Sequence, residues 1–297
     1  MQKKVISLFM VMIMGCSLFA GCGNGKTDES AANTDGTENV GNAGETGDAG
    51  ENGDVGETGD LLSEIQNRGY ITVAMEGTWA PWTYHDEEGE LVGFDVEVAA
   101  AVAEELGVEV RYEEGEWDGL LAGVESGRYD IMVNGVGYTE ERAQAYDFSE
   151  PYCYNKTALI VRSDNDEISS LEDLEGKTTC NSANSTYQFI AEEYGATVLD
   201  VETLDGTLEM VLAGPERADA TLNAEASFLD YMKEHPDTEL KIVDYYSELE
   251  NVCIIMQKGE SSDSLREAIN GAIDKLREDG TLTELSNKYF GGDITKE

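Results

Sequence analysis

From residue 61 onward, segments in which hydrophobic positions recur at helical spacing take turns with short apolar runs of strand length. Residues 61–69, LLSEIQNRG, have helical periodicity that stops at a glycine, and residues 70–75, YITVAM, are an apolar run of strand length. A helix is predicted again at 118–126 and a strand at 129–133. The order of these elements predicts an α/β fold, in which helices cover a parallel sheet.

The helix between the first two strands is predicted from one apolar face. Phe94, Val98, Val102 and Leu106 recur at helical spacing, and Gly107 follows the last of them. We expect the side chain of Asp95 to cap this helix and Gly107 to end it.

The second half of the chain repeats the alternation of strands and helices. Apolar runs predict strands at 156–162, 178–181, 218–223 and 240–245, and one continuous strand at 251–257. Helical periodicity predicts helices at 187–194, 205–214, 262–278 and 282–289.

The first residues have the pattern of an export signal. Lys3 and Lys4 precede an apolar stretch at 5–14 that is too short to be read first as a membrane span. Residues 18–22, LFAGC, resemble the lipobox of bacterial lipoproteins, with Phe19 where the motif prefers leucine. We predict a lipoprotein signal peptide at 1–21 and a lipid on Cys22; the alternative is a plain secretory signal with an incidental cysteine.

Residues 22–60 contain almost no side chain that can build a core. They consist mainly of Gly, Asn, Asp, Glu, Thr and Ala, and GETGD occurs twice. This composition predicts a flexible acidic linker that repels itself. A calcium-binding repeat is the alternative, but the spacing fits neither an EF-hand loop nor a glycine-rich nonapeptide.

Composition limits the partners. The chain has 62 acidic and 19 basic residues and a formal net charge of −43, which disfavours nucleic acid because binding to phosphates needs Lys and Arg. Five cysteines include no CxxC pair, and the two histidines stand far apart in sequence, so we expect no metal site and no cofactor. Acidity alone does not predict a cationic ligand, since most acidic side chains are simply solvated.

One segment combines glycines with an arginine. Residues 130–154 read DIMVNGVGYTEERAQAYDFSEPYCY, a short strand that opens into the turn 134–137 and then reaches Arg142. Backbone N–H groups at such a turn and a guanidinium fork suit capture of a small carboxylate. The alternative is an ordinary β-to-α turn with a solvated arginine.

The same segment resembles one protein family. NGVGYTEERAQAYDFSEPY is similar to the NG…TxER…DFS.PY segment of the family 3 extracellular solute-binding proteins, the polar amino-acid receptors of ABC importers. Further segments that resemble the family are EGTWAPWTY with LVGFD at 76–95, LEDLEGK at 171–177, and ADATLN at 218–223. The resemblance covers most of the chain after residue 61.

The resemblance implies a two-lobed periplasmic-binding-protein-like fold. Each lobe is a mostly parallel sheet flanked by helices, and two strands form the hinge. We expect a discontinuous first lobe at 61–153 and 254–297 and a second lobe at 154–253. Cys153 and Cys253 would then lie on neighbouring crossovers, and we expect two core thiols there; the alternative is a disulfide that stiffens the hinge.

The resemblance also implies the ligand site. Trp79 and Trp117 are expected to flank the ligand side chain, and Arg142 to bind its carboxylate. The full set of expected ligand contacts is Glu76, Trp79, Trp117, Asn134, Gly135, Gly137, Arg142, Asn181, Asn184, Ser185, Thr186 and Asn223.

Two positions depart from the family pattern. Gly137 stands where receptors of α-amino acids usually have Thr or Ser, and Ala224 stands where they usually have the Asp that pairs with the ligand's ammonium group. A buried ammonium needs a partner, and Glu76 is a candidate for it. The alternative is a ligand that is not an ordinary α-amino acid.

These observations predict a monomeric lipoprotein at the outer face of the cytoplasmic membrane. It would capture an amino acid or a related zwitterion by hinge closure and deliver it to an ABC permease, without catalysis. The alternatives are a sensory receptor acting in trans and a cyclohexadienyl-dehydratase-like enzyme, for which Glu76 or Glu225 is the candidate general acid.

Overall fold

The computed structural model describes residues 59–296, which all fall in one compact unit, Asp54–Glu297. The predicted signal peptide, Cys22 and nearly all of the acidic linker lie outside the described residues.

The first lobe contains a five-stranded sheet. Its strand order is β5 (Glu109–Glu114), β1 (Tyr70–Met75), β6 (Ile131–Met132), β15 (Ile255–Gln257) and β7 (Tyr146–Phe148). β1 is parallel to both β5 and β6, whereas β15 runs antiparallel to β6 and β7. The sheet is therefore mixed, with its parallel part formed by the first half of the chain.

Helices cover both faces of this sheet because both faces of β1 are apolar. Ile71, Val73 and Met75 pack in one cluster with helices α1 (Leu61–Arg68), α2 (Phe94–Leu106), α7 (Asp263–Glu278) and α8 (Thr281–Phe290). Ala74 faces the other way and packs with α3 (Trp117–Glu125). A small antiparallel sheet of β2 (Thr78–Trp79), β3 (Thr83–His85) and β4 (Leu91–Val92) connects β1 to α2.

The second lobe repeats this plan with a second five-stranded sheet. Its order is β11 (Thr197–Asp200), β10 (Thr178–Asn181), β12 (Ala220–Ala224), β9 (Thr157–Arg162) and β13 (Leu240–Tyr245). The 3₁₀ turn η2 (Leu171–Leu174) and α4 (Thr186–Glu193) pack on one face. Helices α5 (Leu204–Leu212) and α6 (Glu225–Glu234) pack on the other.

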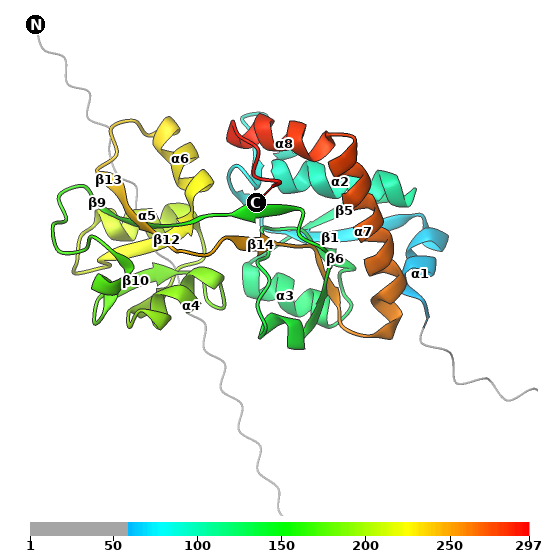
Figure 1. The fold of residues 1–297 in the computed structure, drawn as a ribbon, viewed down its shortest axis with the longest axis horizontal. Coiled ribbons are helices and arrows are strands. Elements are labelled where there is room, and N and C mark those ends of the chain that lie inside the picture. The colour runs from blue at the N-terminus through cyan, green and yellow to red at the C-terminus, as the bar shows by residue number, and fades with distance from the viewer. Residues whose placement is uncertain (1–58, 297) are drawn as a thin grey trace, which may run out of the picture. The chain divides into compact units, whose positions relative to one another are not determined.

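Two short strands join the lobes. β8 (Cys153–Asn155) and β14 (Glu250–Val252) pair antiparallel between the two sheets, as Figure 1 shows at its centre. The C-terminal segment lies beside them, because the N–H of Tyr154 donates to the carbonyl of Ile294 at 2.8 Å.

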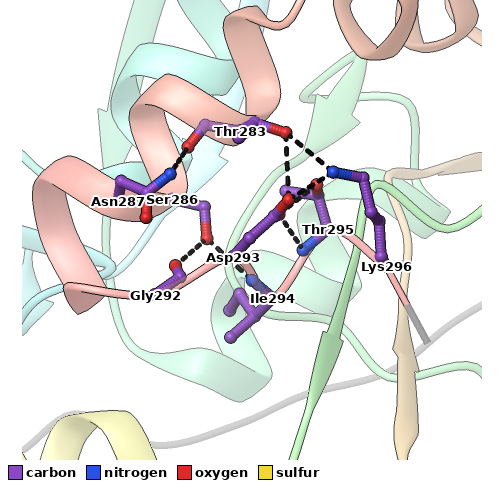
Figure 2. Close-up of polar contacts among 8 residues, drawn as sticks. All are labelled: Thr283, Ser286, Asn287, Gly292, Asp293, Ile294, Thr295 and Lys296. Carbon is purple, nitrogen blue, oxygen red and sulfur yellow. Dashed lines mark hydrogen bonds and ion pairs between the residues drawn. The ribbon is translucent and has the colours of Figure 1, made fainter.

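Asp293 anchors this C-terminal segment, as Figure 2 shows. Its carboxylate accepts hydrogen bonds from Thr283 Oγ1 at 3.1 Å, from Thr295 Oγ1 at 2.6 Å and from Lys296 Nζ at 2.6 Å. Lys296 first, and then Thr295, hold the pKa of Asp293 well below its usual range. The ionised carboxylate therefore helps to hold the chain end against the hinge.

The predicted two-lobed α/β architecture is confirmed, two local predictions are corrected, and one helix was missed. The continuous strand at 251–257 is wrong: the N–H of Cys253 turns to the carbonyl of Val136, which separates β14 from β15. Asp95 does not cap α2, because Gly93 occupies the N-cap position. Helix α6 was not predicted at all.

Asp95 instead connects the first sheet to the hinge. Its carboxylate is fully buried and accepts from the N–H of Gly135 at 2.6 Å and from the hydroxyl of Tyr152 at 2.7 Å. Burial raises the pKa of Asp95 to about 7.

The three cysteines of the described region, Cys153, Cys180 and Cys253, are free and buried. Cys153 pairs in register with Val252, the residue before Cys253. The expectation of neighbouring core thiols agrees with this arrangement. Within residues 59–296, no helix is both long and apolar enough to cross a membrane.

Candidate functional site

A cavity lies between the two lobes, next to the hinge. Glu76, Asn134, Asn181 and Asn223 reach it from the carboxyl ends of β1, β6, β10 and β12. Ligands of open α/β sheets bind at this end of the strands. Its lining consists of Glu76, Thr78, Trp79, Trp117, Asn134, Gly135, Asn181, Ser182, Ser185, Thr186, Tyr187, Glu202, Thr203, Leu204, Thr207, Asn223 and Glu250.

Trp79 forms one wall and is held on three sides. Its ring stacks on Trp82, with centroids 5.2 Å apart, and its Nε1 donates to Asn223 Oδ1 of the second lobe at 3.2 Å. A Cβ at Gly135 would lie 2.5 Å from the Trp79 ring, so only glycine lets the ring approach the turn this closely. Trp82 is fully buried, and its Nε1 donates across to Ser227 Oγ of the second lobe at 3.1 Å.

Trp117 forms a second wall, at the start of α3. The guanidinium of Arg142 lies 5.2 Å from its ring centroid. Its Nε1 is buried and has no hydrogen-bond partner among the described residues, and the same holds for Asn181 Oδ1. Buried polar atoms are rarely left unpaired, so this donor and this acceptor, each on a residue that lines the cavity, suit a polar ligand.

Carboxylates give the cavity a negative character. Asn134 holds Glu76, donating from Nδ2 to Oε2 at 2.7 Å and accepting the backbone N–H of Glu76 at 2.8 Å. Burial, with a contribution from the charges of Glu202 and Glu116, raises the pKa of Glu76 to about 7. Burial also raises the pKa of Glu202, with nearby Asp200 adding to it. Glu250 is the third acidic side chain in the lining.

Arg142 connects the lobes behind the cavity. It begins the short 3₁₀ helix η1 (Arg142–Gln144) and is 6% exposed. Its Nη1 donates to the carbonyl of Gly137 at 2.9 Å and to Thr186 Oγ1 at 3.0 Å, and its Nη2 donates to the carbonyl of Asn184 at 2.8 Å. Burial lowers the pKa of Arg142, and the charge of Glu250 opposes this effect.

The amino terminus of α4 faces the cavity. Ser185 caps the helix by accepting from the N–H of Gln188 at 3.1 Å, and Ser185, Thr186 and Tyr187 all line the cavity. Unpaired N–H groups at a helix start favour a negatively charged ligand group. Asn184 has a left-handed backbone, with φ of 57°, and its side chain donates to Asp118 Oδ1 of the first lobe at 2.9 Å.

Most of the residues that the sequence indicated come together here. Gly137, Arg142 and Asn184 are absent from the cavity lining. Arg142 instead donates to Gly137, Asn184 and the lining residue Thr186. Ligand contact by any of the predicted residues stays a prediction. The residues that line the cavity and were predicted are Glu76, Trp79, Trp117, Asn134, Gly135, Asn181, Ser185, Thr186 and Asn223.

Sequence reasoning missed eight of the lining residues, among them Tyr187, Glu202 and Glu250. Tyr187 follows the predicted Ser185 and Thr186 directly, so its place on the first turn of α4 was a usable signal. Nothing in the sequence distinguishes Glu202 and Glu250 from the other acidic residues of this chain. Within residues 59–296, no group of three or more His, Cys, Asp or Glu is arranged to hold a metal ion.

Comparisons with known proteins point to one family. The model of the bacterial extracellular solute-binding proteins, family 3, matches residues 71–292. The L-cystine-binding protein TcyA of Bacillus subtilis is 34% identical over 297 residues, which is 100% of each chain. It is named as a binding protein and not as an enzyme.

Two solved structures are also similar. An ancestral arginine-binding protein bound to arginine is 35% identical with a TM-score of 0.69, covering 75% of this chain and 99% of that one. The L-cystine solute receptor of Neisseria gonorrhoeae, unliganded and open, is 40% identical with a TM-score of 0.55, covering 80% and 100%. The structure therefore agrees better with the arginine-bound protein than with the open receptor, although the open receptor is closer in sequence.

Proposed function

Since this chain belongs to the bacterial extracellular solute-binding proteins of family 3, we propose that it captures an amino acid that carries a second cationic group. It delivers this solute to an ABC permease. The observation that carries the ligand class is the charge of the cavity, whose lining includes Glu76, Glu202 and Glu250.

The charges around the cavity fall into two groups. The charge of Glu250 raises the pKa of Arg142, and the amino terminus of α4 lies beside Arg142. This group suits the carboxylate and ammonium of an amino-acid head. Glu76 and Glu202 form the other group, and a second ammonium or a guanidinium would relieve their mutual repulsion.

Two relatives support the same class. The Bacillus protein is named for L-cystine, which has two ammonium groups and two carboxylates. An ancestral arginine-binding protein is solved with arginine, which has an ammonium and a guanidinium, and also with glutamine, which has no second cation. L-cystine and arginine both present a second cation at a distance from the amino-acid head. Flat tryptophan rings suit either side chain, since Trp79 and Trp117 offer contact area at little entropic cost.

We propose that the ligand is captured by closure of the two lobes about the hinge. Hydrogen bonds already cross between the lobes from Trp79 to Asn223, from Trp82 to Ser227 and from Arg142 to Thr186. A ligand that contacts both lobes would add to these contacts only in the closed state, and this difference drives closure.

The chain is further proposed to be exported and held at the outer face of the membrane by lipid on Cys22. The sequence of residues 1–22 supports this anchoring. Mass spectrometry of the purified protein should find diacylglycerol on Cys22, and a Cys22→Ser variant should leave the membrane fraction. An unmodified Cys22 in membrane-bound protein would contradict the lipid anchor.

A thermal-shift series on the purified full-length protein tests the ligand class. L-cystine, L-arginine and L-lysine are compared with L-glutamine and L-leucine, because a tight ligand stabilises the folded protein by RT ln(1 + [L]/Kd). At least one dicationic amino acid should raise the melting temperature more than both neutral ones. A response to L-glutamine or L-leucine alone would overturn the proposed class.

A further inference from the structure

Glu250, on hinge strand β14, has the geometry of a specificity-determining residue. We propose that its carboxylate receives the ammonium group of the ligand's amino-acid head. This inference rests on the proposed function, because it takes the ligand to be an α-amino acid.

Glu250 occupies the space that a side chain at position 137 would need. A Cβ built on Gly137 would lie 2.0 Å from Glu250 Oε1 and 2.5 Å from both Cδ and Cγ. Real Cβ atoms do not approach other atoms this closely, so the glycine and the glutamate depend on each other. The loss of a side chain at 137 therefore makes room for a carboxylate from the hinge.

One oxygen of this carboxylate is fixed and the other is free. Asn155, which pairs with Glu250 across the two hinge strands, donates from Nδ2 to Oε2 at 2.9 Å. The same Nδ2 lies 3.2 Å from the hydroxyl of Tyr187, another residue of the cavity lining. Within residues 59–296, no hydrogen bond reaches Oε1, so this oxygen is available to a cation in the cavity.

Glu250 and Arg142 both adjoin Gly137. Arg142 Nη1 donates to the carbonyl of Gly137 at 2.9 Å, while the carboxylate of Glu250 packs against the Cα side of the same glycine. Among the described residues, no ion pair within 4 Å joins the two side chains. The ammonium and carboxylate of an amino acid share one carbon, and a separated cation and anion on either side of one residue can receive them together.

The other carboxylates of the lining are placed differently. Glu76 is held by Asn134 at the end of β1, and its pKa is raised by burial and by Glu202, which favours a cation shared between these two. This arrangement leaves Glu250 as the acidic side chain beside Arg142.

Calorimetric titration of a Glu250→Gln variant tests the inference. Glutamine keeps the shape and can still accept from Asn155, but it removes the charge. The probes are L-arginine with 5-guanidinopentanoate, which lacks only the α-ammonium, and L-cystine with 3,3′-dithiodipropionate, which lacks both ammonium groups. Glu248→Gln, at an exposed neighbouring position, is the matched control.

We expect Glu250→Gln to weaken binding of the amino acid that the wild type recognises by about 30-fold, as a lost charge-assisted hydrogen bond implies. Binding of the matching probe without ammonium should change less than about twofold. If Glu250→Gln weakens binding of the amino acid and of its analogue without ammonium by the same factor, the inference is overturned. It is also overturned if the variant binds the amino acid with wild-type affinity; the proposed function stands in both cases. A wild-type protein that binds no amino acid would overturn both.

A second variant covers the case in which Glu250→Gln does not fold. Gly137→Ser places a Cβ on the Glu250 carboxylate and should displace it, with the same selective loss for the amino acid. If a folded Gly137→Ser protein binds amino acid and probe as the wild type does, the carboxylate at this position has no role in recognition.

Discussion

Lowering the pH from 8 to 6 should weaken binding of a dicationic amino acid, because Glu76 takes up a proton over this range. Its pKa in the ligand-free protein is raised by burial to about 7. A cation beside it would favour the ionised form in the complex, so binding must expel the proton. If Glu76 stays ionised in the complex, the apparent Kd increases by the factor 1 + 10^(pKa − pH), which makes affinity about tenfold lower at pH 6 than at pH 8.

The assay is calorimetric titration with L-arginine at pH 6, 7 and 8, in two buffers with different ionisation enthalpies. The buffer dependence at pH 7 should report release of about half a proton per ligand. Glu76→Gln should bind more weakly at pH 8 and lose this dependence, whereas the exposed control Glu113→Gln should keep both. Asp95 shares a pKa of about 7 but does not line the cavity, so it is not expected to contribute.

The same pKa shift predicts the stability of the ligand-free protein. The folded-state pKa of Glu76 lies above its ordinary value of 4.5, so its contribution to stability is present below pH 4.5 and is lost as the pH rises through 7. Glu76→Gln should therefore gain up to about 3 kcal/mol over the wild type at pH 8 and nothing at pH 4. If affinity does not change from pH 6 to pH 8, or if Glu76→Gln keeps the wild-type dependence of affinity on pH, Glu76 does not release a proton on binding.

Three further predictions follow from the geometry. Arg142→Lys keeps the charge but loses the guanidinium fork that reaches Gly137, Thr186 and Asn184. Calorimetry should show a loss of about 1.5–3 kcal/mol in binding, with Arg128→Lys at an exposed position as the control. Unchanged affinity of Arg142→Lys would exclude Arg142 from recognition. Trp117→Phe removes the unpaired Nε1 donor and should cost about 1 kcal/mol in binding while circular dichroism stays unchanged; an unaffected Kd would mean that the ligand does not reach this N–H. Asp293→Ala should destabilise the fold by about 1 kcal/mol at pH 7, because the depressed pKa of Asp293 contributes stability that is lost only as the pH falls through the folded-state value, well below the ordinary 3.8. Urea unfolding should show most of this difference at pH 3 as well as at pH 7, and equal stabilities of variant and wild type at pH 7 would contradict it.

The elements of the fold could be predicted where the sequence carries a local signal. Gly69 and Gly107 take left-handed conformations at the ends of α1 and α2, as a glycine after an apolar face predicts. The start of α2 was predicted wrongly because Asp95 has the residue type of a cap. Its carboxylate instead accepts hydrogen bonds from the N–H of Gly135 and the hydroxyl of Tyr152, which are distant in sequence. Helix α6 was missed because only Ser227 and Phe228 of its residues are buried, so its apolar face is too narrow to be detected.

The site could be predicted only as far as the motifs extend. The motif residues that line the cavity stand at the ends of strands or at the start of a helix. Such positions can be recognised in the sequence, and in this fold they lie at the cavity. Glu250 could not be found this way, because it meets Gly137 from a strand more than a hundred residues later. The absence of a side chain at Gly137 was visible in the sequence, but what fills its place depends on the pairing of β8 with β14.

The break between β14 and β15 has a similar cause. Residues 251–257 are apolar enough for one strand, but the N–H of Ile254 bonds to Ser149 Oγ and that of Cys253 to the carbonyl of Val136. Tertiary partners therefore override the local pattern at the point where the chain leaves the hinge.

The most direct test of the ligand class is a calorimetric competition on the purified full-length protein between dicationic and neutral amino acids. L-cystine and L-arginine differ in length but share a second cation, whereas L-glutamine has the same kind of head and no second cation. We predict that L-cystine or L-arginine, each with a second cationic group, binds at least about tenfold more tightly than L-glutamine at pH 8. An added charge-assisted contact is worth more than one kcal/mol. Equal or tighter binding of L-glutamine would contradict the assignment of Glu76 and Glu202 to a ligand cation.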